Sequence, residues 1–123
     1  MAGYILVVDD EENMLALLKR VLEKEGWQIK CASTGREGIN LAHQYPFRLA
    51  VLDMFLPDSN GIGILKALKT MDPTISVIMI TAFPSWQKEE EAKALGCSAF
   101  LFKPLDITRL KALIRSEIET LNN

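Results

Sequence analysis

Short hydrophobic runs recur along the chain and alternate with segments of helical spacing. Runs rich in β-branched, aromatic or aliphatic residues are typical of strands, and they cover residues 4–8, 27–32, 47–52, 75–80 and 99–102. Between and after these runs, apolar residues recur three or four positions apart, which predicts helices. The clearest examples are Met14, Leu18, Val21 and Leu22, and then Ile107, Leu110, Ile114, Ile118 and Leu121. The pattern therefore predicts five strand–helix units.

Glycines and polar residues mark where these helices begin and end. Gly26 and Gly96 follow helical segments, where a left-handed residue is favoured, and Ser33 or Thr34 and Asp106 stand where N-caps belong. Alternating strands and helices of this length predict a parallel sheet covered by helices on both faces. The uninterrupted first, third and fourth runs suit central strands, whereas the second alternates with polar residues and suits an edge.

Composition narrows the possible functions. A chain of 123 residues fits one domain, 1–123, because single cores usually occupy roughly 100–150 residues. Hydrophobic residues make up 49% and charged residues 24%, as in a folded globular protein. The formal net charge of −2 offers no positive field for phosphates, so we expect no nucleic acid binding by this segment.

Cysteine usage and hydropathy bear on where the protein acts. Cys31 and Cys97 lack the spacing of metal ligands, and each lies in or beside an apolar run, which favours reduced thiols and a cytoplasmic protein. No apolar run approaches the roughly 18 residues of a membrane span, and the start of the chain lacks the features of a signal peptide. We therefore expect no membrane association.

Polar residues follow four of the predicted strands. Asp9 and Asp10 end the first run, Asp53 the third, Thr81 the fourth and Lys103 the fifth. Parallel strands end at one edge of a sheet, where ligands bind, so these side chains are expected to share a pocket. Facing carboxylates repel by about 1 kcal/mol per pair at 4 Å in water and more in a protein, which calls for a cation. All-oxygen ligation of this kind suits Mg²⁺.

These residues lie in segments that resemble a known signature. Read in order, VVDDE at 7–11, VLDMFLP at 51–57, TA at 81–82 and FKP at 102–104 are similar to the motifs of response regulator receiver domains, the family of the chemotaxis regulators. The resemblance covers nearly the whole chain. It implies an α/β fold of the flavodoxin-like receiver type, with a five-stranded parallel sheet in the order 2-1-3-4-5 and five helices.

The resemblance also assigns a role to each site residue. It implies that Asp53 is the phosphoacceptor and that Asp9, Asp10, Asp53 and the backbone carbonyl of Phe55 bind Mg²⁺. It implies further that Thr81 and Lys103 hold the phosphoryl oxygens, that the Lys103–Pro104 peptide is cis and that Phe100 is a switch aromatic. On this basis the protein is a phosphoacceptor switch in a two-component or phosphorelay system, not an enzyme in its own right, although it assists its own phosphorylation and dephosphorylation.

The same resemblance predicts the partners. The phosphoryl donor is expected to be a phosphohistidine on a sensor histidine kinase or a histidine phosphotransfer protein. The readout is expected at the face formed by the fourth helix, fifth strand and fifth helix, through a homodimer or an output partner. Trp86 lies in this region, either as an anchor for a partner or as a cover for its own helix.

Three positions depart from frequent choices of the family. Phe55 and Phe83 stand two residues after Asp53 and Thr81, and Asn60 lies a few residues after Phe55. Bulky rings at the first two positions predict restricted access for water and hence control over the lifetime of the phosphorylated form.

Other interpretations of the same residues are open at this point. Asp9 and Asp10 could cap the first helix, and Asp53 could initiate a turn. A phosphatase of the haloacid dehalogenase type also uses an aspartyl phosphate but needs a second Asp where Phe55 stands. A flavodoxin-like FMN module shares the topology, but residues 9–12 are all acidic and would repel its phosphate. A receiver that has lost phosphorylation is disfavoured by the intact acidic residues, Thr81 and Lys103.

Overall fold

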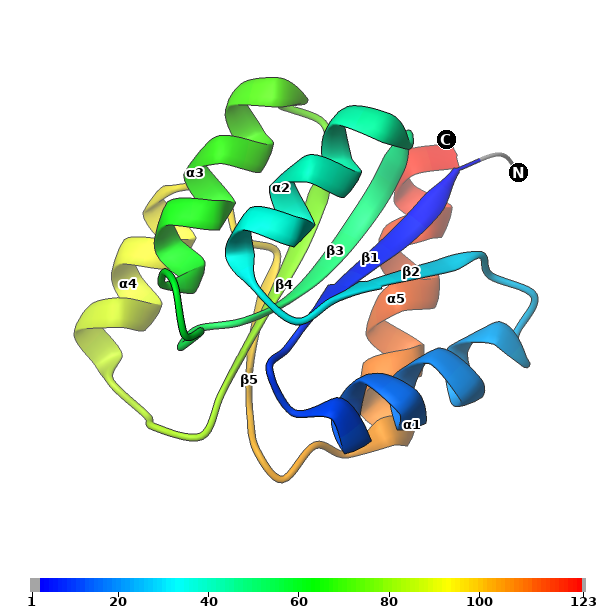
Figure 1. The fold of residues 1–123 in the computed structure, drawn as a ribbon, viewed down its shortest axis with the longest axis horizontal. Coiled ribbons are helices and arrows are strands. Elements are labelled where there is room, and N and C mark those ends of the chain that lie inside the picture. Colours follow the sequence, from blue (N-terminus) through cyan, green and yellow to red (C-terminus); the bar gives the residue numbers. More distant parts are fainter. Residues whose placement is uncertain (1–2, 123) are drawn as a thin grey trace.

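Five strands and five helices alternate along residues 3–122, the part of the chain that this computed structural model describes (Figure 1). The strands are β1 (Tyr4–Val8), β2 (Ile29–Ala32), β3 (Phe47–Asp53), β4 (Ser76–Thr81) and β5 (Ala99–Phe102). The helices are α1 (Glu12–Glu23), α2 (Gly35–Gln44), α3 (Gly61–Met71), α4 (Trp86–Ala94) and α5 (Ile107–Asn122). The predicted alternation is confirmed, and most boundaries agree within one residue.

The strands form one parallel sheet in the order β2-β1-β3-β4-β5. The three uninterrupted hydrophobic runs are its central strands and the alternating second run is an edge, as predicted. The prediction was wrong by two residues at the start of β2, because the paired register with β1 begins at Ile29 and Trp27 packs beside the core instead. All five carboxyl ends lie at the same edge, which places the polar residues that follow them together.

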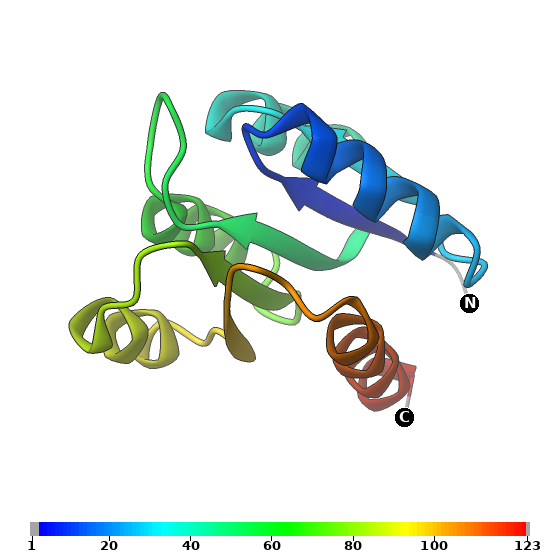
Figure 2. The ribbon, with the colours of Figure 1, turned by 90° about the horizontal axis from the view of Figure 1, so that it is seen from below.

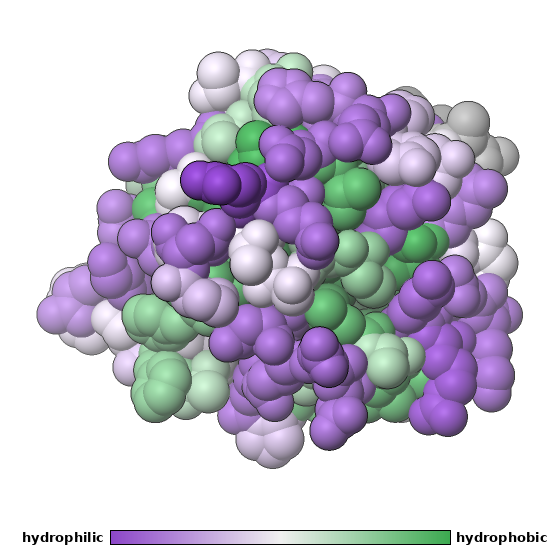
Figure 3. Space-filling view, in the orientation of Figure 1, coloured by the Kyte–Doolittle hydropathy of each residue, from purple (hydrophilic) through white to green (hydrophobic). Residues whose placement is uncertain are grey.

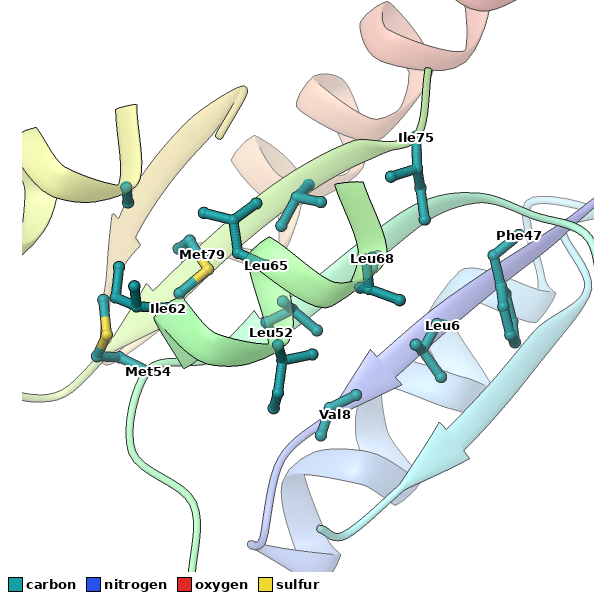
Figure 4. Close-up of a cluster of buried hydrophobic side chains, with 14 of the residues drawn as sticks. Leu6, Val8, Phe47, Leu52, Met54, Ile62, Leu65, Leu68, Ile75 and Met79 are labelled. Atoms are coloured by element: carbon teal, nitrogen blue, oxygen red, sulfur yellow. The ribbon is translucent and has the colours of Figure 1, made fainter. Parts of the chain in front are cut away.

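Helices cover both faces of the sheet (Figures 1 and 2). On one face, α2, α3 and α4 enclose a buried cluster; Figure 4 shows Ile62, Leu65 and Leu68 of α3 among the side chains of β1, β3 and β4. On the other face, α1 and α5 pack Leu18, Leu22 and further apolar residues against the sheet. None of the described helices is long and apolar enough to cross a membrane.

Local signals in the sequence fix several helix ends. The Thr34 side chain accepts a hydrogen bond from Glu37 N at the start of α2, and Asp106 Oδ1 accepts one from Arg109 N at the start of α5. Gly26 and Gly96 adopt φ values of 93° and 96°, which glycine tolerates better than other residues. These predictions are confirmed.

Helix α4 is held differently from the other helices. Only Ala92 is buried among its nine residues, and Trp86 at its first position is 70% exposed. Its polar side chains pair along the helix, with Lys93 Nζ 3.4 Å from Glu89 Oε1. Such exposed pairs contribute little to stability, so α4 is attached to the sheet by a small apolar contact.

Candidate functional site

Acidic side chains and one lysine meet at the carboxyl edge of the sheet. Lys103, which follows β5, places its Nζ 2.9 Å from Asp9 Oδ2 and 3.0 Å from Asp53 Oδ2. The predicted convergence of these three strand ends is confirmed. Glu11 joins them, with its Oε1 2.8 Å from Lys103 Nζ. Sequence reasoning missed Glu11 because that residue lies in the loop after β1, and only the fold brings the loop to Lys103.

Each carboxylate oxygen of Asp53 has a hydrogen-bond partner. Asp53 ends β3 and is buried, which limits the rotamers that it can adopt. Its Oδ1 accepts a hydrogen bond from Phe55 N at 3.1 Å, and its Oδ2 accepts one from Lys103 Nζ at 3.0 Å. The carboxylate is thereby oriented by the loop that follows its own strand and by the loop that follows β5.

Asp9 is completely buried and incompletely satisfied. Its Oδ1 accepts a hydrogen bond from Glu11 N at 2.9 Å. Its Oδ2 has no hydrogen-bond partner among the described residues, although it lies 2.9 Å from Lys103 Nζ in an ion pair. Burial raises the pKa of Asp9 and outweighs the lowering effects of the Glu11 amide and of Lys103. The ionised form of Asp9 is therefore unfavourable in this environment. Asp9 does not cap α1, whose N-cap, Glu11, makes no side-chain cap hydrogen bond.

Lys103 remains protonated in this setting. Burial alone would lower the pKa of Lys103, but its close contacts with the carboxylates of Glu11, Asp9 and Asp53 outweigh burial and raise the pKa above the ordinary value for lysine. A single ammonium thus faces three carboxylates. Around Lys103 Nζ, the carboxylates therefore outnumber the ammonium group that they contact.

The acidic residues fit a divalent cation. Asp9, Asp10 and Asp53 each offer a carboxylate oxygen, and these oxygens all lie within 4.8 Å of one another. The buried Asp9 Oδ2 without a hydrogen bond supplies a ligand atom that is already desolvated. Asp10 is exposed, so the same position is open to water, which Mg²⁺ retains among its ligands. The donor set therefore suits Mg²⁺, because the ligand atoms are oxygens and the groups that supply them are carboxylates.

Thr81 and Phe100 lie on β4 and β5, and among the described residues no hydrogen bond joins Thr81 to Asp53. Thr81 is completely buried, and its Oγ1 accepts a hydrogen bond from Phe83 N at 3.1 Å and lies 3.4 Å from Phe83 O. Phe100 is partly buried against the cluster that α3 covers, with its ring centroid 5.7 Å from that of Phe102. The peptide between Lys103 and Pro104 is cis, as the sequence predicted.

Two exposed aromatic rings connect the loops after β3 and β4. The ring centroids of Phe55 and Phe83 are 5.5 Å apart with an interplanar angle of 81°, an edge-to-face arrangement, while 45% and 67% of these residues stay exposed. Figure 3 shows hydrophobic surface at the lower left, where Figure 1 places the start of α4 and the loop before it. Two of the three departures from the family pattern, Phe55 and Phe83, are thus in contact beside the acidic site.

Comparison with known proteins decides the family. The sequence model of the response regulator receiver domain matches residues 5–115. The chain belongs to the response regulator receiver domain family. Sporulation initiation phosphotransferase F of Bacillus subtilis (strain 168) is 34% identical to this receiver domain, over 97% of this chain and 96% of the relative. Among the other curated relatives, which include transcriptional regulatory proteins, the chain spans 51% of the length of one and 26% of another.

Solved receiver domains share the fold closely. A CheY-like receiver domain protein from Methanospirillum hungatei JF-1 has a TM-score of 0.94 and 29% identity, with 98% of this chain and 96% of that one covered. The beryllofluoride-activated NtrC4 receiver domain, solved as a dimer, has a TM-score of 0.90 and 33% identity, with 95% and 97% covered. The predicted fold and strand order are confirmed. The protein is a receiver domain of the kind that two-component response regulators use, a family that interacts with histidine kinases or phosphotransfer proteins.

Proposed function

We propose that Asp53 is the residue of this receiver domain that accepts the phosphoryl group. The observation that carries the proposal is the environment of its carboxylate: Lys103 Nζ lies 3.0 Å from Oδ2, and ligand oxygens of Asp9 and Asp10 lie within 4.8 Å of an Asp53 oxygen. A nucleophilic carboxylate needs charge stabilisation and orientation more than further covalent chemistry in a phosphoryl transfer. Both are available at this position.

The donor in the proposal is a phosphohistidine on a histidine kinase or phosphotransfer protein. An Asp53 oxygen attacks phosphorus, the phosphorus–nitrogen bond breaks with its electron pair passing to the imidazole, and an acyl phosphate forms. Attack of water on phosphorus later releases inorganic phosphate and restores the carboxylate. Mg²⁺ held by Asp9, Asp10, Asp53 and the Phe55 carbonyl would neutralise the charge on the phosphoryl oxygens. Lys103 would exchange its contact with Asp53 for one with a phosphoryl oxygen.

Thr81 and Phe100 carry the signal in this proposal. The Thr81 hydroxyl would leave its 3.4 Å contact with Phe83 O and donate to a phosphoryl oxygen. That movement vacates space beside β4, which the ring of Phe100 would enter. The exposed face of α4, β5 and α5 would change as a result, and the dimeric NtrC4 receiver supports a homodimer as one readout, with an output partner as the other. We propose that residues 1–123 act as one such domain.

Intact-mass measurement after incubation with acetyl phosphate and Mg²⁺ tests this assignment. Wild-type protein is expected to gain one phosphoryl group, and Asp53→Asn is expected to gain none. Asp72→Asn is the matched control, because Asp72 follows α3 at the opposite end of the sheet, and it should be modified like wild type. Modification of Asp53→Asn at the wild-type rate, or none in wild type, would overturn the proposal.

A further inference from the structure

Asp58, in the loop between β3 and α3, binds the start of α2. Its Oδ1 accepts a hydrogen bond from Gly35 N at 2.9 Å, and its Oδ2 accepts one from Arg36 N at 3.0 Å. Figure 2 shows this loop rising from the end of β3 to a position beside the first turn of α2. The backbone hydrogen bonds lower the pKa of Asp58, so the residue is ionised at neutral pH and adds a favourable charge at the helix start.

The contact completes the N-terminus of α2. The first N–H groups of a helix have no partner within the helix itself. In α2, Thr34 Oγ1 accepts from Glu37 N at 3.1 Å, and the N–H groups of Gly35 and Arg36 are those that Asp58 takes up. The N-terminus of α2 is therefore capped both by Thr34, which precedes the helix in the sequence, and by Asp58, from a distant loop.

Gly35 permits the loop to come this close. A Cβ atom built on Gly35 would overlap the hydroxyl oxygen of Ser59 and would lie 2.9 Å from Ile64 Cδ1. Ser59 is next to Asp58 in the sequence. The side chain of Ser59 therefore packs directly against the backbone of Gly35, and a larger residue at position 35 would not fit. The contact between the loop and α2 therefore depends on two features. Gly35 has no side chain, and Asp58 supplies a carboxylate.

The loop connects the contact with α2 to Asp53. Phe55 and Asn60 form an antiparallel bridge across it, and Leu56 N donates to Ser59 O at 3.0 Å, so the loop is a small hairpin with Asp58 at its tip. At its base, Phe55 N holds Asp53 Oδ1 at 3.1 Å. Movement of the tip therefore displaces the amide that orients Asp53.

We propose that Asp58 is a positioning residue of the phosphorylation site, which fixes the loop of Phe55 by fastening it to α2. This inference rests on the proposed function of Asp53. Among the described residues, no hydrogen bond or ion pair joins Asp58 to the acidic residues of the site or to Lys103. Asp58 acts through the hairpin, on the amide of Phe55 and on the carbonyl that the proposed function assigns to Mg²⁺. Small displacements of such groups are costly in catalysis because the reacting atoms require tight positioning.

Amide hydrogen exchange in the unphosphorylated protein without Mg²⁺ tests the attachment. In Asp58→Ala, the backbone amides of residues 55–60, apart from Pro57, which has no N–H, are expected to exchange roughly tenfold faster, the order of magnitude of a lost helix cap. Thr34→Ala is the matched control, since it removes a cap from the same helix without touching the loop. It should speed exchange at the start of α2 and leave residues 55–60 at wild-type rates. Asp58→Asn, which keeps an acceptor oxygen but no charge, should fall between.

The dependence of phosphorylation on Mg²⁺ concentration tests the link to the site. Asp58→Ala is expected to raise the half-saturating Mg²⁺ concentration roughly tenfold by the same reasoning, and to lower the rate at saturating Mg²⁺ as well, because the amide that orients Asp53 is displaced. Equal shifts in Asp58→Ala and Thr34→Ala, or wild-type exchange of Phe55 in Asp58→Ala, would overturn the inference. If wild-type protein accepts no phosphoryl group, the proposed function fails, and the exchange comparison still decides whether Asp58 holds the loop.

Discussion

The two edges of the sheet are built from different chemistry. At the amino edge, the rings of Tyr4 and Tyr45 pack 5.0 Å apart, Phe47 packs 6.3 Å from both, and Lys30 Nζ lies 4.5 Å from the Tyr45 ring centroid. Farther along that edge, buried Ser76 donates to Glu117 Oε1 at 2.5 Å. At the carboxyl edge, carboxylates crowd one lysine, and a buried oxygen of Asp9 lacks a hydrogen bond.

The difference shows at which edge the interactions oppose folding. Polar groups at the amino edge are satisfied and the rings there are packed, so that edge serves stability. Buried like charges at the carboxyl edge oppose folding, and a structure tolerates them where a ligand will use them. Removing a side chain at the amino edge should therefore lower stability and leave function intact, whereas removing an acidic side chain at the carboxyl edge should raise stability and impair function.

Phe47→Ala should produce the largest loss of stability. Phe47 is buried and packs in the aromatic cluster of the amino edge, so we expect the free energy of unfolding to fall by about 3–4 kcal/mol. Denaturant unfolding measures this, with Phe47→Leu as a milder control. The phosphorylation rate per folded molecule should stay unchanged; a fall in that rate would show that the two edges are not separable.

Lys103→Met removes the cation that contacts Asp9, Glu11 and Asp53 at the other edge. We expect the free energy of unfolding to fall by about 3 kcal/mol without Mg²⁺, as for a buried ion pair that loses one partner. Saturating Mg²⁺ should restore part of this loss, because the ion neutralises the same carboxylates. Unfolding curves with and without Mg²⁺ test this, and identical losses in the two conditions would contradict the assignment of the metal site.

Asp9→Asn should act in the opposite direction. Because burial raises the folded-state pKa of Asp9, its ionised form costs stability above that pKa, and the cost vanishes below the model-compound value of 3.8. The variant is therefore expected to be more stable than wild type at neutral pH, and the two should converge as pH falls. Unfolding measured from pH 3 to pH 7 without Mg²⁺ tests the sign, and a less stable variant at pH 7 would refute it. Phosphorylation of the variant should need more Mg²⁺.

Replacing both exposed rings, Phe55→Ser with Phe83→Ser, should barely change stability. Exposed substitutions usually stay within about 0.5 kcal/mol, although the ring pair itself is lost. We expect the phosphorylated form to hydrolyse faster, because the rings limit the approach of water. Loss of the phosphoryl group followed by intact mass tests this, and an unchanged lifetime would show that the pair has no such role.

Sequence patterns predicted the fold more completely than the site. The alternation of strands and helices, the central and edge strands, and the meeting of Asp9, Asp53 and Lys103 all follow from local periodicity and from the geometry of a parallel sheet. Glu11 and Asp58 escaped because their partners lie 92 and 23 residues away and no local pattern records such contacts. The Thr81 hydroxyl is hydrogen-bonded to Phe83 in this structure. The position of a side chain on a strand therefore does not determine its hydrogen-bond partner.

The sparse attachment of α4 has a mechanical consequence. A helix that commits only Ala92 to the interior gives up little hydrophobic contact when it slides or tilts, so it is the segment most easily moved without disturbing the sheet. A single added phosphate can shift a balance of only a few kcal/mol. Helix α4, which buries little apolar surface, directly follows the strand that ends in Thr81. A free-energy change of this size is therefore enough to move α4.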